Sequence, residues 1–405
     1  MSWVTGVDSG HPYGVHNLPY GAVSEGGGDP RLVVRVGDLG LDLAAACERL
    51  LPDLAPLVAG PVLNPLLAAP APTWRRLRAA LVEWLTDESV RPVVEPLLTP
   101  LAEARTHLPF AVGDYVDFYA SEHHASAVGR IFRPDSPPLP ENWKHLPIGY
   151  HGRSGTVVVS GTPVARPSGQ RRLSGGAIEV GPSRRLDIEA EVGFVLGAGT
   201  RLGEPVALAD AAEHVFGVCL VNDWSARDLQ AWEYVPLGPF LGKSFATSVS
   251  PWVVPLDAFD GARTAPPPRD VALASYLDDA AQPPWGLDIA LEVELNGTVV
   301  SRPPFPAMYW TAAQMLAHMT VNGASIRPGD LFASGTVSGP EPDQAGSLLE
   351  LSRGGRSPIE LAGGVTRSFL EDGDRVVIRG RVPAAPGRPE LALGEVAGVV
   401  VAALQ

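Results

Sequence analysis

The segment Leu186-Asp187-Ile188-Glu189-Ala190-Glu191-Val192 alternates acidic and apolar side chains. Because successive side chains of a β-strand point to opposite faces, Glu189 and Glu191 are expected on one face and the apolar residues on the other. Two carboxylates about 7 Å apart along a strand can share one cation. The alternative is a strand whose acidic face is simply hydrated, and for this motif alone that alternative is the more common.

Two further acidic residues stand beside apolar or aromatic residues. Asp223 follows the apolar run 218–221, at the end of a predicted strand, and Asp117 lies in the aromatic segment 115–119. Burying an unpaired carboxylate is costly, so positive charge is expected among the four acidic residues. Carboxylate oxygens without Cys or His partners suit hard cations such as Mg²⁺, Ca²⁺ or Mn²⁺. The sequence therefore predicts an oxygen-rich site for a divalent cation, provided that these segments converge.

Length and composition bound the class of protein. With 405 residues, the chain is long for one hydrophobic core, so a large domain and a smaller one are expected. A net charge of −14 argues against general binding to nucleic acid or to anionic membranes. Cys47 and Cys219 lie far apart in apolar context, which indicates reduced core residues. No apolar run reaches the roughly 18 residues that span a bilayer, and the first residues lack a secretion signal. A soluble cytoplasmic protein is expected.

The local patterns predict a change of character along the chain. Residues 31–36 form a strand pattern, and the spacing of residues 74–85 predicts a helix with Thr73 as its N-cap. Beyond about residue 112 most patterns are strands between Gly- and Pro-rich turns, which places the boundary between an N-terminal domain 1–110 and a C-terminal domain 111–405. Further strands are predicted at 156–159, 185–196, 215–221, 288–295, 330–334 and 375–379, and helices at 311–319 and after Ser121.

Several longer motifs resemble the fumarylacetoacetase family. They follow one another in the family's order along almost the whole chain, and the first of them is absent from shorter members of the wider superfamily. The motifs are Asn17-Leu18-Pro19-Tyr20-Gly21, Asp114-Tyr115-Val116-Asp117-Phe118-Tyr119, Leu146-Pro147-Ile148-Gly149-Tyr150-His151-Gly152-Arg153, Asn222-Asp223-Trp224-Ser225-Ala226-Arg227-Asp228, Trp232 to Phe245, and Arg327-Pro328-Gly329-Asp330-Leu331.

The resemblance implies a fold and an activity. The fold would be mainly β with α+β elements: a small N-terminal SH3-like barrel domain with helices, and a large C-terminal mixed β-roll domain that carries the site and forms a homodimer. The activity would be metal-dependent hydrolysis of a carbon–carbon bond in a small molecule, 4-fumarylacetoacetate, to fumarate and acetoacetate, the last step of tyrosine and phenylalanine catabolism. The cofactor would be a divalent cation, Ca²⁺ or Mg²⁺.

The resemblance also implies roles for residues at matching positions. The metal carboxylates are Asp117, Glu189, Glu191 and Asp223. A second cation is implied near Lys243 and Thr247, where only a hydroxyl or backbone oxygen could serve as ligand, because an ammonium group is a poor one.

The water-activating base is His124 backed by Glu350. His124 is preferred to His123 because the family's base comes directly before an alanine, seven residues after the metal aspartate. Glu350 lies in an apolar segment that we expect to be a strand. The implied charge-stabilising residues are Arg227, Gln230 and Lys243, and the implied substrate-binding residues are Tyr119, Arg133, Tyr150, Gln230, Tyr234 and Thr336.

Other functions remain open. The same carboxylates could serve an enzyme that hydrolyses or decarboxylates acylpyruvates or other β-diketones. A non-catalytic protein with a structural cation would instead close its site with protein ligands. The sequence contains no GxSxG, GxxxxGK[ST] or HExxH motif, so a serine hydrolase, a nucleotide-binding protein and a zinc protease have no support. Segments 173–183 and 262–284 match nothing in the family, and substrate preference or dimer contacts there stay open.

Overall fold

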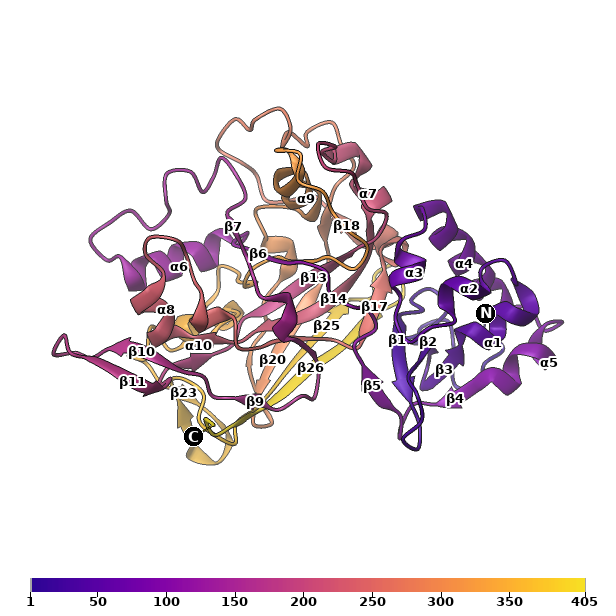
Figure 1. The fold of residues 1–405 in the computed structure, drawn as a ribbon, viewed down its shortest axis with the longest axis horizontal. Coiled ribbons are helices and arrows are strands. Elements are labelled where there is room, and N and C mark those ends of the chain that lie inside the picture. Colours follow the sequence, from indigo (N-terminus) through magenta and orange to yellow (C-terminus); the bar gives the residue numbers. More distant parts are fainter. Residues whose placement is uncertain (1, 405) are drawn as a thin grey trace.

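The fold is described from a computed structural model for residues 2–404, and its largest element is a 13-stranded sheet (Figure 1). The strands of this sheet are β1 (Tyr20–Ser24), β2 (Arg31–Val36), β3 (Leu39–Asp42), β4 (Leu98–Pro100), β5 (Arg105–His107), β6 (Tyr115–Phe118), β7 (Gly149–His151), β8 (Val157–Val159), β13 (Ala190–Leu196), β14 (Val215–Asp223), β16 (Thr247–Val249), β17 (Trp252–Pro255) and β22 (Leu331–Ala333). Their main order is β4-β3-β2-β1-β17-β14-β13-β22-β6-β7. The sheet thus joins the first strands of the chain to those that carry the predicted metal ligands.

The first five strands form an open arrangement. Strand β1 pairs with β2, β5 and β17, and β3 pairs with β2 and β4. Within residues 2–404 no pairing joins β4 to β5, so this sheet does not close on itself. The predicted mainly β class with helices is confirmed, whereas a closed SH3-like barrel is not observed.

A second sheet packs near the centre of the C-terminal part. Its strands are β21 (Thr298–Ser301), β20 (Ala290–Leu295), β25 (Arg375–Val382), β26 (Leu391–Val401) and β9 (Val164–Ala165), in that order. Four strand pairs stand apart from both sheets: β10 (Ser168–Arg172) with β11 (Ile178–Pro182), β12 (Leu186–Asp187) with β15 (Ser225–Ala226), β18 (Arg263–Thr264) with β19 (Gly286–Leu287), and β23 (Ile359–Glu360) with β24 (Thr366–Arg367). The unmatched segment 173–183 therefore belongs largely to the β10–β11 hairpin, and 262–284 spans β18 and the long connection to β19.

Helices fall into an N-terminal and a C-terminal group (Figure 1). The N-terminal helices are α1 (Leu43–Leu50), α2 (Ala55–Val58), α3 (Asn64–Leu67), α4 (Ala71–Trp84) and α5 (Arg91–Val94). The C-terminal helices are α6 (Glu122–Phe132), α7 (Ala211–His214), α8 (Arg227–Glu233), α9 (Ala312–Thr320) and α10 (Leu348–Leu351). Within residues 2–404, no helix combines the length and the apolar character needed to cross a membrane.

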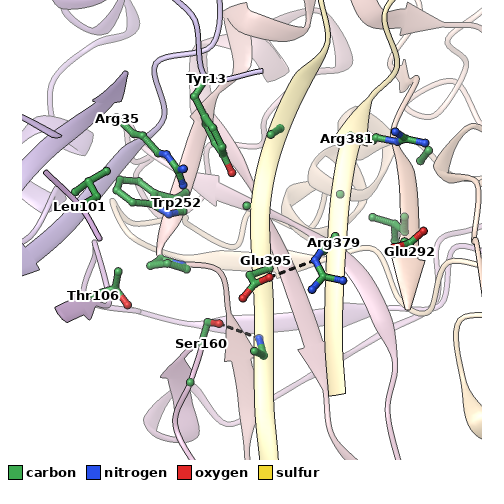
Figure 2. Close-up of a pocket in the computed structure, with 18 of the residues that line it drawn as sticks. Tyr13, Arg35, Leu101, Thr106, Ser160, Trp252, Glu292, Arg379, Arg381 and Glu395 are labelled. Atoms are coloured by element: carbon green, nitrogen blue, oxygen red, sulfur yellow. Dashed lines mark hydrogen bonds and ion pairs between the residues drawn. The ribbon is translucent and has the colours of Figure 1, made fainter. Parts of the chain in front are cut away.

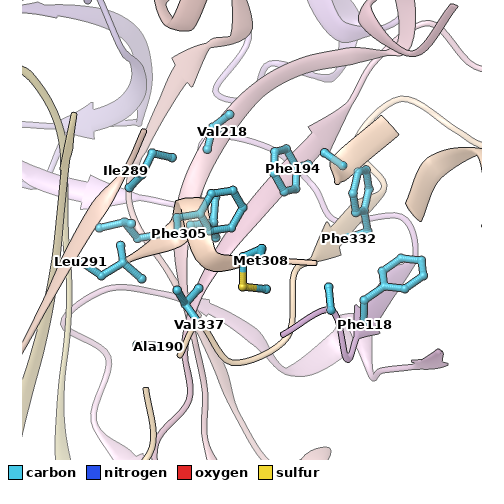
Figure 3. Close-up of a cluster of buried hydrophobic side chains, with 14 of the residues drawn as sticks. Phe118, Ala190, Phe194, Val218, Ile289, Leu291, Phe305, Met308, Phe332 and Val337 are labelled. Carbon is cyan, nitrogen blue, oxygen red and sulfur yellow. The ribbon is translucent and has the colours of Figure 1, made fainter. Parts of the chain in front are cut away.

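The central strands β13 and β14 are buried on both faces. Val218 and Leu220 of β14 pack into a C-terminal core that also contains Phe194 and Phe332, whose rings stack with centroids 5.1 Å apart (Figure 3). Cys219 of β14 instead packs into an N-terminal core together with the helices of the first part. This double burial explains the continuous apolar run before Asp223, since a strand covered on both sides needs no polar face.

Several sequence-based expectations for local structure can now be checked. The helices expected after Ser121 and at 311–319 are present, and Ser121 and Thr311 are their N-caps. Helix α4 begins at Ala71 with Pro70 as its N-cap, so the prediction of Thr73 as the cap was wrong. A proline in the first turn lacks only an N–H that the helix would leave unpaired anyway, which explains the earlier start.

Two expected strands differ in the structure. The strand expected over 185–196 is interrupted at Ile188 and Glu189: β12 before the interruption pairs with β15, whereas β13 after it pairs with β14. The strand expected around Glu350 is the short helix α10. Ser347 caps this helix by accepting a hydrogen bond from the Glu350 N–H at 3.3 Å. A serine before an apolar run is a helix-start signal that the apolar pattern concealed.

Gly335, which follows β22, sits where only glycine fits. Its φ is +76°, and a Cβ there would lie 2.1 Å from the carbonyl oxygen of Phe118. Gly297 has a similar φ of +81° but nothing within 4 Å of its Cβ position. Gly297→Ala should lower the free energy of unfolding by about 1 kcal/mol from backbone strain. Gly335→Ala should lower it by about 1–3 kcal/mol more through steric overlap. Urea unfolding midpoints of the two variants measure this difference, and equal losses would contradict the close approach.

Candidate active site

The four predicted metal carboxylates converge at one place in the fold. Asp117, Glu189, Glu191 and Asp223 are buried, and one carboxylate oxygen from each lies within 4.8 Å of the others. The convergence that the sequence could not establish is therefore present. A buried acidic group of this kind can bind a divalent metal ion, since hard cations take oxygen ligands.

Strand pairing brings these residues together from distant parts of the chain. Asp117 lies on β6, which runs parallel to β22, and β22 in turn pairs with β13, the strand of Glu191. Asp223 is the last residue of β14, on the other side of β13. Glu189 precedes β13 at the interruption, where its N–H is 3.2 Å from the Asn222 side-chain oxygen. The acidic residues therefore gather at one end of adjacent strands, a common place for functional side chains.

Two positively charged side chains compensate part of this buried negative charge. The Lys243 ammonium contacts the Glu189 carboxylate and lies 2.5 Å from Asp223 Oδ2. Arg227, the first residue of α8, places Nη2 2.7 Å from Glu189 Oε1 and Nε 2.8 Å from Asp187 Oδ2. The positive charge expected among the acidic residues is therefore supplied by the chain itself.

The carboxyl groups differ in their affinity for protons. Burial raises the pKa of Asp117 and of Glu191 well above the ordinary range, and the neighbouring carboxylates add to the shift. Burial also raises the pKa of Glu189, but the charges of Lys243 and Arg227 outweigh it, and the net shift is downward. Burial lowers the pKa of Lys243, but Asp223 and Glu189 outweigh this effect and the net shift is upward. Lys243 therefore stays charged, and its side chain cannot ligate a second cation.

Unpaired oxygens test whether a cation fits. Both carboxylate oxygens of Glu191, together with Asp117 Oδ1, are buried without a hydrogen-bond partner among the described residues. Burying such atoms unpaired is costly, and a bound cation would satisfy them. The donor set of carboxylate oxygens without Cys or His matches Mg²⁺, Ca²⁺ or Mn²⁺.

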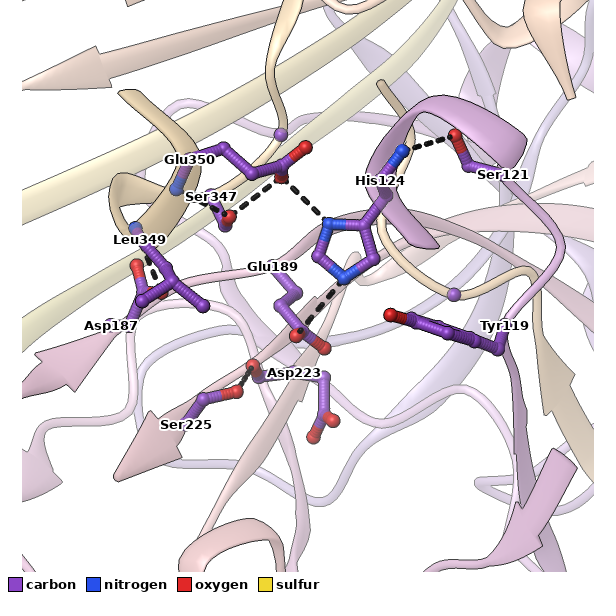
Figure 4. A network of polar contacts seen from close by, with 12 residues as sticks. Tyr119, Ser121, His124, Asp187, Glu189, Asp223, Ser225, Ser347, Leu349 and Glu350 are labelled. Atoms are coloured by element: carbon purple, nitrogen blue, oxygen red, sulfur yellow. Dashed lines mark hydrogen bonds and ion pairs between the residues drawn. The ribbon is translucent and has the colours of Figure 1, made fainter. Parts of the chain in front are cut away.

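A histidine and its orienting carboxylate stand beside this carboxylate cluster (Figure 4). His124, in the first turn of α6, has Nδ1 2.7 Å from Glu350 Oε2 and Nε2 3.9 Å from Glu189 Oε1. Burial raises the pKa of Glu350, but His124 and two serine hydroxyls outweigh it and lower the pKa. An ionised Glu350 accepts from Nδ1–H, which leaves Nε2 able to accept a proton on the side of the cluster.

Asp187 links the two halves of the site, although the sequence analysis assigned it no role. Its carboxylate receives Arg227 Nε and, at 2.7 and 3.1 Å, the N–H groups of Leu348 and Leu349 at the start of α10. Helix α10 carries Glu350, so Asp187 couples the position of Arg227 to that of the histidine's partner. The acidic residue in the quoted motif was the available signal, but its partner lies 161 residues away.

The other sequence-predicted residues surround the cluster to different degrees. The Tyr150 hydroxyl donates to Asp223 Oδ2 at 3.0 Å, and the Thr247 hydroxyl donates to Asp223 Oδ1 at 3.0 Å. Gln230 accepts from Arg227 at 3.2 Å, and the Tyr119 ring packs edge-on against His124 at 5.4 Å. These four residues therefore contact the site directly.

Three predicted residues make no polar contact with the cluster in the described part of the chain. Thr336 is buried, and its hydroxyl has no partner. Arg133 ends α6 and donates to the Pro138 carbonyl at 3.3 Å, and Tyr234 ends α8. None of the three is paired with a carboxylate of the cluster.

A hollow of about 1040 Å³ lies away from this chemistry (Figure 2). Its walls include Tyr13, Trp252 and several arginines of the second sheet, but no residue of the carboxylate cluster. Those arginines are paired with carboxylates, as with Arg379 and Glu294 at 2.7 Å. We place the candidate active site at the smaller carboxylate cluster, because size alone supplies no reactive group.

Similarity to known proteins extends over nearly the whole chain. Residues 16–109 match the family model for the fumarylacetoacetase N-terminal region, and residues 115–401 match that for the fumarylacetoacetate hydrolase C-terminal region. The chain is 45% identical over 414 residues to the fumarylacetoacetase of Homo sapiens, covering 98% of this chain and 97% of that protein. The chain belongs to the fumarylacetoacetase family. Another family member, from Arabidopsis thaliana, is 44% identical over 400 residues, covering 93% of this chain and 92% of that protein.

Solved structures support the fold of this fumarylacetoacetase-family chain. A fumarylacetoacetate hydrolase from Exiguobacterium antarcticum superimposes with a TM-score of 0.55 at 18% identity, covering 95% of this chain and 99% of that one. A maleylpyruvate hydrolase from Sphingobium sp. SYK-6, in complex with manganese(II) and pyruvate, gives 0.53 at 18% identity, covering 96% and 100%. At these identities the likeness concerns the fold alone.

Divalent cation binding should release protons. The raised pKa values of Asp117 and Glu191 favour their protonated forms in the metal-free protein, whereas a cation requires their ionised forms. Affinity should therefore fall as the pH falls. Calorimetric titration with Mn²⁺ in buffers of different ionisation enthalpy measures the proton count. Binding without proton release near neutral pH would contradict this account of the cluster.

Proposed function

We propose that this protein is a fumarylacetoacetase, which hydrolyses 4-fumarylacetoacetate to fumarate and acetoacetate in tyrosine and phenylalanine breakdown. The observation that carries the proposal is the position of the His124–Glu350 pair beside a buried cluster of four carboxylates. Family membership over nearly the whole chain indicates the substrate, because relatives that the chain matches over more than nine-tenths of their length bear this name. We further propose Ca²⁺ or Mg²⁺ as the cofactor, held by Asp117, Glu189, Glu191 and Asp223.

His124 prepares the attacking water. With Nδ1–H donated to Glu350, the free Nε2 accepts a proton from water, and the hydroxide adds to the carbonyl carbon at the fumaryl end. The bond from that carbon to the neighbouring CH₂ then breaks, and its electron pair leaves with the acetoacetyl fragment as an enolate. Protonation of the CH₂ carbon gives acetoacetate, and the other fragment is fumarate. A divalent cation held by Asp117, Glu189, Glu191 and Asp223 would supply Lewis acidity that polarises the attacked carbonyl.

Nearby cationic and polar groups stabilise the developing negative charge. Arg227 Nη2 lies close to Glu189 but lacks hydrogen-bond geometry to any described residue, so it can donate to a substrate oxygen. Thr336 has an equally unpaired hydroxyl. Gln230 and Lys243 stand beside them, and each preorganised donor is typically worth about 3 kcal/mol. Tyr119, Arg133, Tyr150 and Tyr234 complete the proposed substrate contacts, with Arg suited to carboxylate recognition.

The finer architectural expectations belong to the same proposal. The chain would divide into domains 1–110 and 111–405, the first with an open, SH3-like arrangement of strands, and would work as a homodimer in the cytoplasm. A second cation near Lys243 and Thr247 would have to use backbone or hydroxyl oxygens, since the Lys243 ammonium is engaged by carboxylates.

The base assignment can be tested on two neighbouring histidines. His124→Gln should lower kcat at least about 100-fold, because a general base contributes that much or more. Cation affinity and the thermal midpoint should change little. His123, the exposed neighbour on the same helix, provides the matched control, and His123→Gln should keep full activity. Equal activities of the two variants would refute the role of His124 and would favour a structural cation.

The substrate is tested by direct turnover. With Mg²⁺ or Ca²⁺ present, fumarylacetoacetate should lose its near-ultraviolet diketone absorbance and give fumarate and acetoacetate in equal amounts. Activity should disappear when a chelator removes the cation and return on its addition. Much faster turnover of acylpyruvates would instead assign the protein to the alternative group of β-diketone hydrolases.

A further inference from the structure

A second hollow of about 600 Å³ borders the carboxylate cluster on the side of Tyr150. Its walls include Tyr150 and Lys243, which both contact Asp223 through their side chains, and the loop residues His151 and Arg153. Among the described residues that line it, none is acidic. Because Lys243 is already paired with carboxylates, Arg153 supplies the unpaired positive charge of this wall, and in a chain of net charge −14 such a charge favours an anionic ligand group.

The loop that carries Arg153 is held at both ends by the strands of the site. Strand β7 pairs with β6, which places Tyr150 opposite Asp117, and β8 pairs with β16, which places Val157 opposite Thr247. Between them the Thr156 hydroxyl donates to the Ser244 carbonyl at 2.9 Å. Arg153 is therefore carried on a short loop that is fixed relative to the cluster.

Gly152 brings this loop close to the strand of Asp117. Its N–H donates to the Tyr115 carbonyl at 2.9 Å, and a Cβ at this position would lie 2.3 Å from the Tyr115 ring. Any larger residue would push the next residue outward. The close approach keeps Arg153 at the wall of the hollow.

Arg153 has no carboxylate partner within 4.0 Å in residues 2–404, and its guanidinium makes no hydrogen bond there. It lies over the Phe240 ring at 5.7 Å from the centroid. Arg133, the residue that caps the end of α6, is also unpaired with any described carboxylate. The two unpaired arginines therefore belong to different elements: Arg133 follows the helix that carries His124, and Arg153 lines the same hollow as Tyr150 and Lys243.

We propose that Arg153 binds the carboxylate at the acetoacetyl end of the substrate, while Arg133 serves the fumaryl end. This inference rests on the proposed function and deepens it. His124 is carried by the helix that Arg133 caps and delivers hydroxide to the fumaryl carbonyl, so the departing acetoacetyl fragment would extend away from this helix, toward Lys243 and the hollow. Its terminal carboxylate then meets Arg153, which makes Arg153 a residue that selects dicarboxylic diketones.

Three diketones separate the two ends. Fumarylacetoacetate has both carboxylates, fumarylacetone lacks the one at the acetoacetyl end, and 3,5-dioxohexanoate lacks the one at the fumaryl end. Arg153→Gln should lower kcat/KM about tenfold to hundredfold for the two diketones that carry the acetoacetyl carboxylate, mainly through KM, as expected for one charge-assisted hydrogen bond. Fumarylacetone should be unaffected. Arg153→Lys should recover part of the loss, and an analogue that is not turned over is measured as a competitive inhibitor.

Arg201→Gln is the matched control, because Arg201 is exposed and follows the end of β13 that points away from the carboxylates. It should behave like the unmodified enzyme with all three diketones. An equal loss with fumarylacetone, or no loss with fumarylacetoacetate, would overturn the assignment of Arg153. Failure of the unmodified enzyme to cleave any of the three would instead refute the proposed function itself.

Discussion

The arrangement of this molecule depends on Glu189 being held between Lys243 and Arg227. Four carboxylates from different strands could not be buried together if their charges were uncompensated, because desolvation and mutual repulsion would both oppose folding. The charged side chains of Lys243 and Arg227 keep Glu189 ionised, while burial favours protonated forms of Asp117 and Glu191. The fold therefore contains a partly neutralised acidic cluster with oxygens left unpaired, and that combination makes the cluster suitable for a metal ion.

The central sheet supplies the rigidity that such a cluster requires. Strands β13 and β14 are packed on both faces, so their ends have little freedom to move. Asp187 then extends this order to α10, through two backbone N–H groups and Arg227. The base His124 is positioned by α6 on one side and by Glu350 of α10 on the other. Packing of the core therefore also fixes the positions of the reacting groups.

The sequence could predict the ligands but not the connections that position them. Strand alternation and apolar flanks identified Asp117, Glu189, Glu191 and Asp223 as candidate ligands, and the order of the motifs indicated the family. The interruption at Glu189 was missed because it depends on a distant pairing of strands, and the helix at Glu350 was missed because the apolar pattern concealed the serine that caps it. Asp187 contacts an element 161 residues later, and no periodicity encodes such a contact. Arg153 lies inside a quoted motif, yet only the hollow beside Tyr150 indicates that its side chain could bind a ligand.

The internal ammonium and guanidinium groups have a consequence for the life of the protein in a cell. Small zinc domains reach their shape only when the ion arrives, because the free energy of metal binding drives the folding that their small cores cannot. Here the polypeptide carries its own counter-charge at Lys243 and Arg227, so it is expected to mature without the ion. Scarcity of the ion would then leave a dormant but intact pool of enzyme, and renewed supply would restore catalysis without new synthesis.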